Sequence, residues 1–521
     1  MKPKIYTARE AVEKFVKTGD TIAISGFSQS TLARELLYAI SDSFTEGGAP
    51  ADLTFISGAG LILSLDIVAK EGLTSNLICG HYGPNDEMRK FVSENKCKSY
   101  NFPQGIIGHL MRAYGNGEKG VLTKVGLGTY IDPRIEGAKM NAVTTEDIVS
   151  VVDFQGEEYL YYTTPKPNVT ILRGSVADEK GNVSLDEEMW LSFATYAAKA
   201  AHANGGKVIV QVKEIVKTGS MPARKIAIPG ILVDAIVLTQ DKAKNHRFTP
   251  NTEFSRFLLG EYKMPLENPP AMPLSERKLI ARRAAMELIP DAVVNIGIGS
   301  PEAVSAVCLE EDCSDLLELT VECGIIGGAL APNERFGVHV NYDCLVDEVT
   351  QFDFYHSGGL DVTFLGNAQT SANGDVNVSK FGPLPTGGGG FIDIVQNTKK
   401  VVFCGALTAG GLKEKVEDGK LTILQEGKVK KFVNTLEQIS FNAKYAVDNN
   451  FDVLYITDRA VFRLTAGGLE LIEYAPGIDM EKDIFDQMEF RPLVSENLKL
   501  MDEKLLRAEP IGLREYILSK A

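Results

Sequence analysis

One order of predicted elements occurs twice in this sequence, once on each side of a proline-rich segment near the middle of the chain. Four prolines fall among the twelve residues from Tyr262 to Pro273, so this segment forms neither a continuous helix nor a central strand. Residues 7–35 have the pattern of a helix, a strand and a glycine turn into a second helix, and residues 275–302 repeat that pattern. The sequence therefore predicts two copies of one folding unit.

A second pair of segments supports the repeat. Residues 173–184 and 366–379 are alike, and each is followed at a distance by a predicted strand that begins with Lys-Val, at Lys207 and Lys400. Short buried strands that alternate with helices are typical of doubly wound sheets. We predict an α/β fold of two similar open α/β domains, with the functional site in the cleft between them, where small-molecule sites are commonly found.

The proline-rich segment also sets the predicted domain boundaries. We expect an N-terminal half over residues 1–262, a linker over residues 263–273 and a C-terminal half over residues 274–521. In the first half a helix is predicted from Thr31 to Ile40. Three further strands of its sheet are predicted at Leu53 to Ser57, Val121 to Val125 and Val208 to Val212.

Charge and cysteine content limit the classes of partner. The 521 residues carry a formal net charge of −15, and because nucleic acids and anionic membranes need basic surfaces, we expect neither as a partner. We find no apolar export segment and no run of about 18 apolar residues. The seven cysteines are scattered without a CxxC or Cys/His cluster, so we expect reduced thiols, no metal site and a cytoplasmic location.

The stretch from Leu319 to Gly328 presents one carboxylate, Glu322, between an apolar β-prone run and a series of glycines. This pattern places a side chain at the carboxyl end of a strand, and Glu322 is our candidate nucleophile; the alternative is an ordinary glutamate in a solvated turn. Residues 53–58 align without gaps on residues 319–324, which sets Ile56 opposite Glu322. An apolar counterpart indicates that this position faces the interior. Burying an unpaired carboxylate there costs free energy, so a carboxylate at this position favours a functional role over a purely structural one.

The segment Gly297-Ile298-Gly299-Ser300-Pro301 follows a predicted strand and opens a helix, which is the setting of a phosphate-binding turn. It is not a dinucleotide fingerprint, because the third glycine position of GxGxxG is occupied by Glu302. Ser300 as N-cap and Pro301 as first helical residue explain part of the pattern in structural terms. A ligand contact through the backbone from Gly297 to Ser300 stays open.

Two further segments offer hydrogen-bond donors. The segment from Pro385 to Ile394 contains four successive glycines, which form either a flexible loop or a place where backbone N–H groups stabilise an oxyanion. The segment Phe102-Pro103-Gln104-Gly105 either aims the Gln104 amide at a ligand or is a plain turn. We interpret His109 and Arg112, on one face of the helix that follows, as structural.

The remaining motifs exclude common enzyme classes. Lys413, in the loop after a strand, is either a phosphate contact or a solvated surface lysine. The sequence has no GxSxG, HExxH or Walker A pattern, which disfavours the common hydrolases and phosphotransferases.

Together these motifs resemble the family I CoA-transferases over essentially the whole chain, and most of all the single-chain propionate/acetate CoA-transferase branch with fused halves. The motifs that carry the resemblance are Glu322-Cys323-Gly324-Ile325-Ile326-Gly327-Gly328, the loop from Gly387 to Asp393, Phe102-Pro103-Gln104-Gly105 and Gly126-Leu127-Gly128-Thr129-Tyr130-Ile131-Asp132-Pro133-Arg134.

The resemblance implies a role for each motif. Glu322 corresponds to the nucleophile of the family, and Gln104 and an amide of the Gly388/Gly389 pair correspond to its oxyanion partners. The turn from Gly297 to Pro301 matches a CoA-contacting segment, and Lys413 is a further candidate for CoA binding. The family uses CoA and acyl-CoA as substrates without a tightly bound cofactor, and its members are commonly homo-oligomers.

The expected activity is therefore CoA transfer between an acyl-CoA and a carboxylate, for short-chain acids such as acetate, propionate or butyrate, by ping-pong chemistry through a glutamyl-CoA thioester. An acyl-CoA hydrolase on the same scaffold and a non-catalytic metabolite-binding module are the alternatives. Cys323 stands where the family has serine, and we expect it to add sensitivity to oxidation. The loop from Gly26 to Glu35 lacks a glycine and a proline of the family pattern, which leaves the acyl specificity open.

Overall fold

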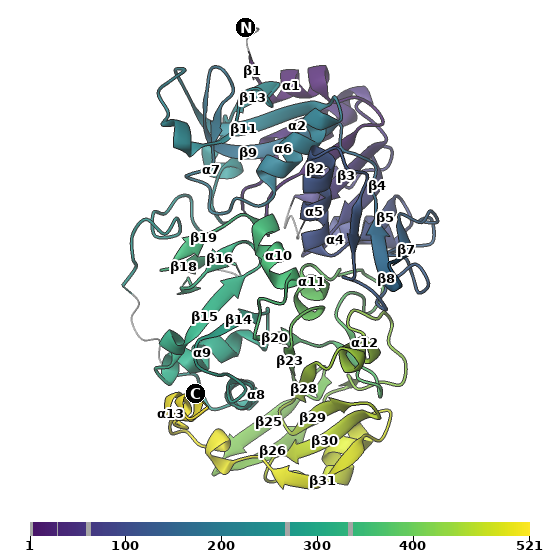
Figure 1. Cartoon of the computed structure of the whole chain (residues 1–521), viewed down its shortest axis with the longest axis vertical. Helices are drawn as coiled ribbons and strands as arrows, with labels where there is room; N and C mark the ends of the chain where they lie inside the picture. The colour runs from purple at the N-terminus through teal and green to yellow at the C-terminus, as the bar shows by residue number, and fades with distance from the viewer. Residues whose placement is uncertain (1–3, 29, 59–63, 266–270, 332–336, 521) are drawn as a thin grey trace.

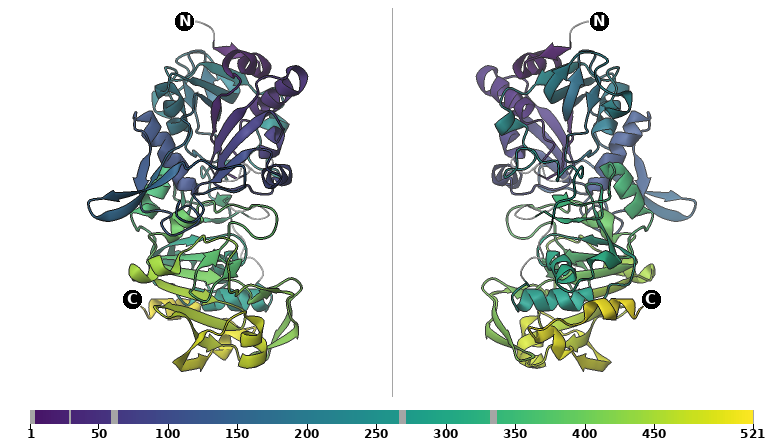
Figure 2. Two further views of the ribbon diagram at one scale, coloured as in Figure 1. Left: turned by 90° about the vertical axis from the view of Figure 1, so that its right-hand side faces the viewer. Right: turned by 90° about the vertical axis from the view of Figure 1, so that its left-hand side faces the viewer.

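The computed structural model describes residues 4–28, 30–58, 64–265, 271–331 and 337–520. Its two halves are stacked along the long axis, with the N-terminal half in purple to teal and the C-terminal half in green to yellow (Figure 1). Each half is built on one large sheet flanked by helices, so the predicted α/β fold of two similar halves is confirmed. In the side views, the hairpin of β7 and β8 projects from the flank of the N-terminal half (Figure 2).

The N-terminal sheet is parallel along its main path. Its long central strands consist mostly of Val, Ile and Leu and are largely buried, as expected of parallel strands covered on both faces. In order across the sheet they are β1 (Ile5–Tyr6), β13 (Ala235–Leu238), β11 (Lys207–Val216), β9 (Val169–Asp178), β2 (Thr21–Ile24), β3 (Leu53–Ser57), β4 (Thr74–Cys79) and β5 (Lys98–Asn101), with β10 (Val183–Ser184) and β12 (Ile226–Ile228) beside this path.

The C-terminal sheet has a parallel centre and antiparallel additions at both sides. In order across the sheet its strands are β19 (Cys344–Leu345), β16 (Ile325–Ile326), β15 (Leu317–Val321), β14 (Ala292–Ile296), β20 (Val362–Gly366), β23 (Lys400–Cys404), β28 (Asp452–Ile456), β29 (Ala460–Thr465), β30 (Gly468–Tyr474) and β31 (Leu493–Leu500).

Helices cover the sheets and fill the junction between the halves, and α1 begins with the capping box that Thr7 and Glu10 predict. The helices of the first half are α1 (Ala8–Phe15), α2 (Arg34–Gly47), α3 (Leu65–Val68), α4 (Asp86–Ser93), α5 (Gln104–Gly115), α6 (Ala194–Ala203) and α7 (Lys242–Asn245). Those of the second half are α8 (Glu276–Ala285), α9 (Glu302–Glu310), α10 (Glu348–His356), α11 (Phe391–Val395), α12 (Ala443–Asp448) and α13 (Leu513–Leu518).

Smaller sheets carry the remaining strands, which are β6 (Val121–Thr123), β7 (Val149–Phe154), β8 (Glu157–Tyr162), β17 (Ala329–Leu330), β18 (His339–Val340), β21 (Gln369–Thr370), β22 (Val376–Asn377), β24 (Thr408–Ala409), β25 (Lys413–Glu417), β26 (Lys420–Gln425) and β27 (Val429–Lys430). Within the described part of the chain, no helix has the length and apolar character needed to span a bilayer.

The internal repeat is present in the strand order. In the first half the order β13-β11-β9-β2-β3 corresponds to β28-β23-β20-β14-β15 in the second half. In both halves the chain builds outward to one side from β2 or β14 and then returns to build outward on the other side. The boundary between β2 and β9, and the matching boundary between β14 and β20, are thus topological switch points, where open α/β sheets bind ligands.

The strand registers correct the gapless alignment of Ile56 with Glu322. Ile56 pairs with Ala23, the third residue of β2, and Leu319 pairs with Val294, the third residue of β14. By these pairings Glu322 is not the counterpart of Ile56 and corresponds to a position past the end of β3. The sequence comparison misplaced the pair because Leu-Thr occurs in both segments at different points: Leu53-Thr54 begins β3, whereas Leu319-Thr320 lies in the middle of β15.

Two other predicted elements differ from the structure. The predicted strand from Val121 to Val125 forms β6, which pairs with β8 outside the main sheet and is half-exposed. The helix predicted from Thr31 begins at Arg34. Residues 266–270 of the predicted linker lie outside the described residues, as does Gln29 in the loop before α2.

Candidate active site

Glu322 lies at the tip of the tight turn between β15 and β16. The strands that flank it are paired through Val321 and Ile325, so residues 322–324 connect them directly. Gly324 makes this turn possible: its φ is +104°, and a Cβ at that position would lie 1.9 Å from the carbonyl oxygen of Val346. The expected placement of Glu322 directly after a strand is therefore present in the structure.

The Glu322 carboxyl is buried, and its Oε2 atom has no hydrogen-bond partner among the described residues. Burial raises its pKa to about 7, and the charge of Asp393 acts in the same direction, while a hydrogen bond from the Asn295 amide favours the ionised form. A buried carboxyl that titrates near neutral pH and has one unpartnered oxygen is suited to attack a carbonyl carbon.

Gln104 is the first residue of α5 and reaches across to the C-terminal half. Its side-chain Nε2 donates to Oε1 of Glu348 at 2.8 Å, and its backbone N–H donates to the carbonyl oxygen of Gly389 at 3.0 Å. The side chain is fully buried, and its Oε1 atom has no partner among the described residues. Because Nε2 carries two hydrogens, the second N–H stays available to a ligand.

Glu348, the first residue of α10, is a site residue that the sequence interpretation missed. Its carboxyl is completely buried, and burial followed by the nearby charges of Glu322 and Asp393 raises its pKa to about 8, against the effect of the Gln104 bond. At neutral pH the group is therefore mostly protonated. In the sequence, Asp347 and Glu348 look like the ordinary acidic start of a helix, and Asp347 does cap α10 at Thr350.

The glycine tract lies between the halves and is bound by residues of the N-terminal half. The N–H of Gly388 donates to Oδ1 of Asn101 at 2.9 Å, and the N–H of Gly389 donates to the carbonyl oxygen of Gly80 at 2.7 Å. The N–H of Gly390, a buried residue, has no acceptor among the described residues. Buried N–H groups are rarely left unpaired, so the Gly390 amide marks a place for a ligand oxygen.

Asp393 and Asp353 attach α5 to the C-terminal half. The buried Asp393 accepts from the N–H of Gly105 at 3.0 Å and contacts Nε2 of His356 at 2.9 Å. Asp353 on α10 binds both His109, at 3.0 Å, and Arg112, which agrees with the structural role predicted for these two residues. Glu322, Gln104, Glu348 and the glycine tract therefore meet where α5 packs against α10 and α11 (Figure 1).

Comparison with known proteins places this geometry in a family. Residues 5–239 match the family model described as coenzyme A transferase. The acetate CoA-transferase YdiF of Escherichia coli K12 is 40% identical over 513 residues, which cover 98% of this chain and 96% of the relative. The chain belongs to the coenzyme A transferase family. The caffeate CoA-transferase of Acetobacterium woodii is also 40% identical, with 98% of each chain covered.

A solved structure supports the assignment to the coenzyme A transferases. The crystal structure of the acyl-CoA transferase YdiF apoenzyme from Escherichia coli O157:H7 superposes with a TM-score of 0.92, covering 98% of this chain and 97% of that chain, at 40% identity. A second structure of that protein, with a TM-score of 0.90, is described as a thioester complex with CoA. The chain is thus an enzyme that transfers CoA between acyl-CoA and carboxylate, with CoA thioesters as its substrates, and the resemblance seen in the sequence is confirmed.

The turn from Gly297 to Pro301 of this coenzyme A transferase lies at the same sheet edge as Glu322, because β14 and β15 are adjacent and parallel. The amides of Ile298, Gly299 and Ser300 have no acceptor among the described residues, and the space around the Cα of Gly299 is open. The expected cap is different, however. The helix α9 begins at Glu302 with Pro301 at the N-cap and no side-chain capping bond, so Ser300 does not cap it.

Two other expectations do not fit this site. Lys413 is exposed at the start of β25, which lies at the end of the C-terminal half farthest from α10 and α11 (Figure 1). The structure therefore does not bring Lys413 to Glu322. Cys323 is fully buried, and burial raises the pKa of its thiol well above the ordinary value, so it lacks the thiolate character that oxidation requires.

Proposed function

We propose that this enzyme transfers CoA between short-chain acyl-CoA and free carboxylic acids through a covalent thioester on Glu322. The observation that carries the proposal is the buried Glu322 carboxyl with a pKa of about 7 and one unpartnered oxygen, located where the two halves meet. The Gln104 amide reaches the same junction from the other half. A side chain that served only the fold would be paired or solvated.

Each step of the proposed reaction consumes one anion, a carboxylate or the CoA thiolate, and releases the other kind, so charge is balanced. The ionised Glu322 attacks the carbonyl carbon of the acyl-CoA thioester, the C–S bond breaks, and a mixed anhydride and CoA thiolate form. The thiolate then attacks the Glu322 carbonyl carbon, which gives a glutamyl-CoA thioester and releases the donor acid as its carboxylate. The acceptor carboxylate reverses these steps, so no ATP and no water are consumed.

Each attack creates an oxyanion that needs hydrogen-bond donors at the place where the charge develops. The second N–H of Gln104 Nε2 is one proposed donor, because its first N–H is bound to Glu348. The amides of Gly388 and Gly389, the donors implied by the family resemblance, are occupied by Asn101 and Gly80. We therefore assign the second donor to the N–H of Gly390, next in the same tract.

Glu348 is proposed to position Gln104. A neutral carboxyl accepts one N–H of Gln104 and so fixes the direction of the other N–H without adding a second negative charge beside Glu322. The raised pKa of Glu348 therefore suits the reaction: the group orients the donor while remaining uncharged at neutral pH.

The preference for short acids rests on the packing beside the nucleophile. Val321 and Cys323, on either side of Glu322, belong to a buried apolar cluster with Phe27, Trp190 and Phe248 from the N-terminal half. Phe27 and Trp190 pack edge-to-face with ring centroids 5.0 Å apart. These large side chains fill the space on this side of Glu322, which favours a small acyl group. The two relatives with 40% identity are named for acetate and caffeate, and the packing favours the smaller acid.

The decisive experiment is chemical trapping. The enzyme is incubated with acetyl-CoA or butyryl-CoA, the thioester is reduced with borohydride or cleaved with hydroxylamine, and the modified peptide is mapped by mass spectrometry. We expect modification of Glu322 only, and modification of any other residue would overturn the assignment. In parallel, free CoA should appear at a substantial rate only when acetate is present as acceptor, which separates a transferase from a hydrolase.

Three properties of the chain remain predictions. We propose that residues 1–262 and 274–521 act as the two domains on either side of the linker, that the enzyme is cytoplasmic, and that it forms homo-oligomers. Analytical ultracentrifugation of the full chain tests the last of these, with a sedimentation coefficient larger than that of a monomer as the expected result.

A further inference from the structure

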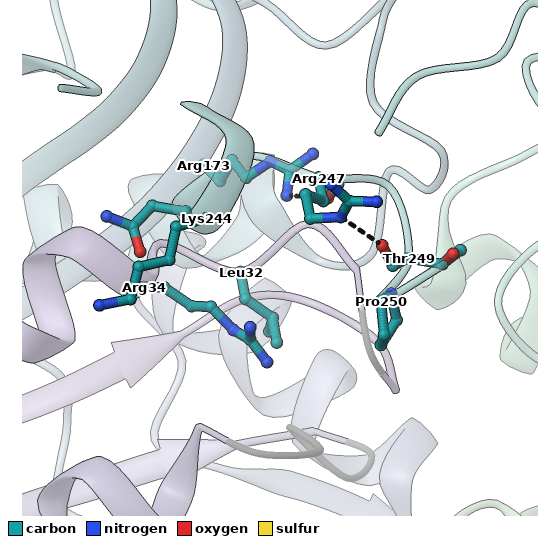
Figure 3. A pocket seen from close by; sticks show the side chains of 8 residues that line it. Leu32, Arg34, Arg173, Lys244, Arg247, Thr249 and Pro250 are labelled. Carbon is teal, nitrogen blue, oxygen red and sulfur yellow. Dashed lines mark hydrogen bonds between the residues drawn. The ribbon is translucent and has the colours of Figure 1, made fainter. Parts of the chain in front are cut away.

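A cavity in the N-terminal half is lined by none of the residues around Glu322 and takes no part in the proposed chemistry. It encloses about 30 Å³, and its wall includes the basic residues Arg34, Arg173, Lys244 and Arg247 but no carboxylate (Figure 3). The basic residues come from four different places in the chain: the start of α2, the strand β9, the helix α7 and the segment after α7.

The cavity lies at the switch point of the N-terminal sheet. The last pair between β2 and β9 joins Ile24 to Ile171, and β9 continues beyond it, so Arg173 stands just past the carboxyl end of β2. The chain that leaves β2 supplies Arg34 to the same cavity. In open α/β sheets this crevice is where ligands bind, and within the repeat it corresponds to the crevice that holds the Gly297 turn in the other half.

Arg173 gives the strongest sign of a missing ligand. Its side chain is 2% exposed, Nε is 2.8 Å from Oε2 of Glu188, and Nη1 donates to the carbonyl oxygen of Arg247 at 2.8 Å. The third nitrogen, Nη2, is buried without a hydrogen-bond partner among the described residues. A buried guanidinium donor without an acceptor is costly, and an anion in the cavity would supply the acceptor.

Two carboxylates near the cavity, Glu188 and Glu35, are engaged with other groups of the protein. Glu188 is shared between Arg173 and His246, whose Nε2 lies 3.2 Å from Oε1. Glu35, the other carboxylate nearby, accepts from the N–H of Gln240 and from the Asn245 side chain. Burial and the neighbouring charge of Arg34 lower the pKa of Arg173, which shows that the two guanidinium groups repel each other.

We propose that this cavity is a binding site for a phosphate group. Guanidinium groups match the geometry of phosphate oxygens, and three of them, from Arg34, Arg173 and Arg247, face one small space. Lys244 adds charge from the rim, where its Nζ lies 4.8 Å from the centre of the Tyr38 ring. The cavity is larger than the ~10–15 Å³ that one water molecule requires, so it suits a group of a few atoms, such as a phosphate, and not a larger part of the molecule that carries it.

The test measures binding of inorganic phosphate to the full chain by isothermal titration calorimetry in chloride buffer. Arg247→Gln removes a charge from the cavity, and we expect it to weaken binding about tenfold, the size of one charge-assisted hydrogen bond. Arg173→Met should weaken it more. Lys242→Gln is the matched control, because Lys242 is exposed on the same helix as Lys244 but does not line the cavity, and binding should stay unchanged.

Circular dichroism spectra of the variants establish folding, and Arg247→Gln decides the question if Arg173→Met does not fold. The proposal is overturned if the wild type does not bind phosphate in the millimolar range, or if Arg247→Gln and Lys242→Gln bind it equally well. Because binding needs no thioester chemistry, the same result is expected in Glu322→Ala, so failure of the proposed reaction would leave this test intact.

Titrations with CoA and dephospho-CoA identify the source of the phosphate. If the cavity holds the 3′-phosphate of CoA, Arg247→Gln weakens binding of CoA but not of dephospho-CoA. Equal weakening of both assigns the cavity to the diphosphate of CoA. If neither changes while inorganic phosphate binds less well, the ligand is free phosphate or another phosphorylated compound. All three outcomes retain a phosphate site and differ only in its occupant.

Discussion

The two halves share a strand order, and they differ in chemistry at the edge where the parallel strands end. In the C-terminal half this edge carries Glu322 after β15 and the open amides of the Gly297 turn after β14. In the N-terminal half it carries a basic cavity around Arg173. The fifth residue of β9 is Arg173 and the fifth residue of β20 is Gly366, and they pair with Gln211 and Cys404, the fifth residues of the next strands.

This comparison separates the positions that form the fold from the positions that carry the chemistry. The repeated positions build two sheets and position two crevices, whereas positions that differ, such as Arg173 against Gly366, carry charge in one half only. If the comparison is correct, removing a charged side chain at a position where the two halves differ should sharply impair the function of that half. The fold should remain intact. The predictions below test this, beginning with the largest effect.

Replacing Glu322 should remove activity almost completely. Glu322→Gln keeps the shape of the side chain but removes the attacking carboxylate, and we expect kcat to fall by at least about 10⁴-fold, in the range found when a covalent nucleophile is deleted. Steady-state assays with acetyl-CoA and propionate measure the loss. Unfolding followed by circular dichroism should show no destabilisation, and a variant with more than a few per cent of wild-type activity would contradict the role of this edge.

Replacing Gln104 should have the next largest effect, because it tests the contribution of the opposite half to the same site. Gln104→Ala removes the side-chain donor while the backbone bond to Gly389 remains, and we expect kcat to fall by about 10²–10³-fold with a smaller change in KM. Gln240→Ala is a matched control, because Gln240 is exposed beside α7 and takes no part in the contacts described around Glu348. Equal effects of the two changes would exclude an oxyanion role for Gln104.

The sequence predicted the framework of this site better than its details. The order of helices and strands and the position of Glu322 at a strand end follow from local patterns, because turns and strand ends leave local signals, whereas the link between Gln104 and the glycine tract came from the family resemblance. Glu348 and the orientation of individual glycine amides could not be predicted. They depend on contacts between segments more than two hundred residues apart, such as the bond from Gln104 to Glu348, which leave no local pattern.

The register error has a similar physical cause. Residues 53–57 and 317–321 are both short strands that contain Leu-Thr, but at different places, so matching these two letters shifts one strand against the other. Only the pairing with β2 and β14 shows which residues correspond. The proposal of Lys413 as a CoA contact rested on a local pattern, a lysine after a glycine-rich loop. Whether such a lysine reaches the site depends on where its hairpin lies in the fold, which the local pattern does not show.

Glu348 is proposed to position Gln104 without reacting itself, and the effect of replacing it on the rate should depend on pH. In the wild type, the rate of thioester formation should rise through pH about 7 as Glu322 ionises and fall above about 8 as Glu348 ionises beside it. Glu348→Gln still accepts a bond from Gln104 but cannot ionise, so we expect near-wild-type activity at pH 7 and no fall at high pH. Glu348→Ala also cannot ionise but loses the bond, so it should be about tenfold slower than Glu348→Gln at every pH.

Rapid-mixing measurement of CoA release between pH 6 and 9.5 checks this. An unchanged alkaline limb in Glu348→Gln would assign that limb to another group, and equal rates for the Gln and Ala variants would show that the bond to Gln104 does not position the donor.

The smallest predicted effect concerns stability, and its sign follows from the pKa of Glu322. The folded-state pKa is raised from an ordinary value near 4.5 to about 7, so the folded protein binds the extra proton and loses this stabilisation as pH rises through that window. Glu322→Gln has no such proton to lose. Relative to the wild type, the variant should therefore gain stability between pH 5 and 8, by at most on the order of 3 kcal/mol, seen as a rise of a few degrees in the unfolding midpoint. Differential scanning calorimetry of both proteins at pH 5 and pH 8 measures this difference. If the variant lost stability with rising pH as steeply as the wild type, Glu322 would not be buried in the folded enzyme.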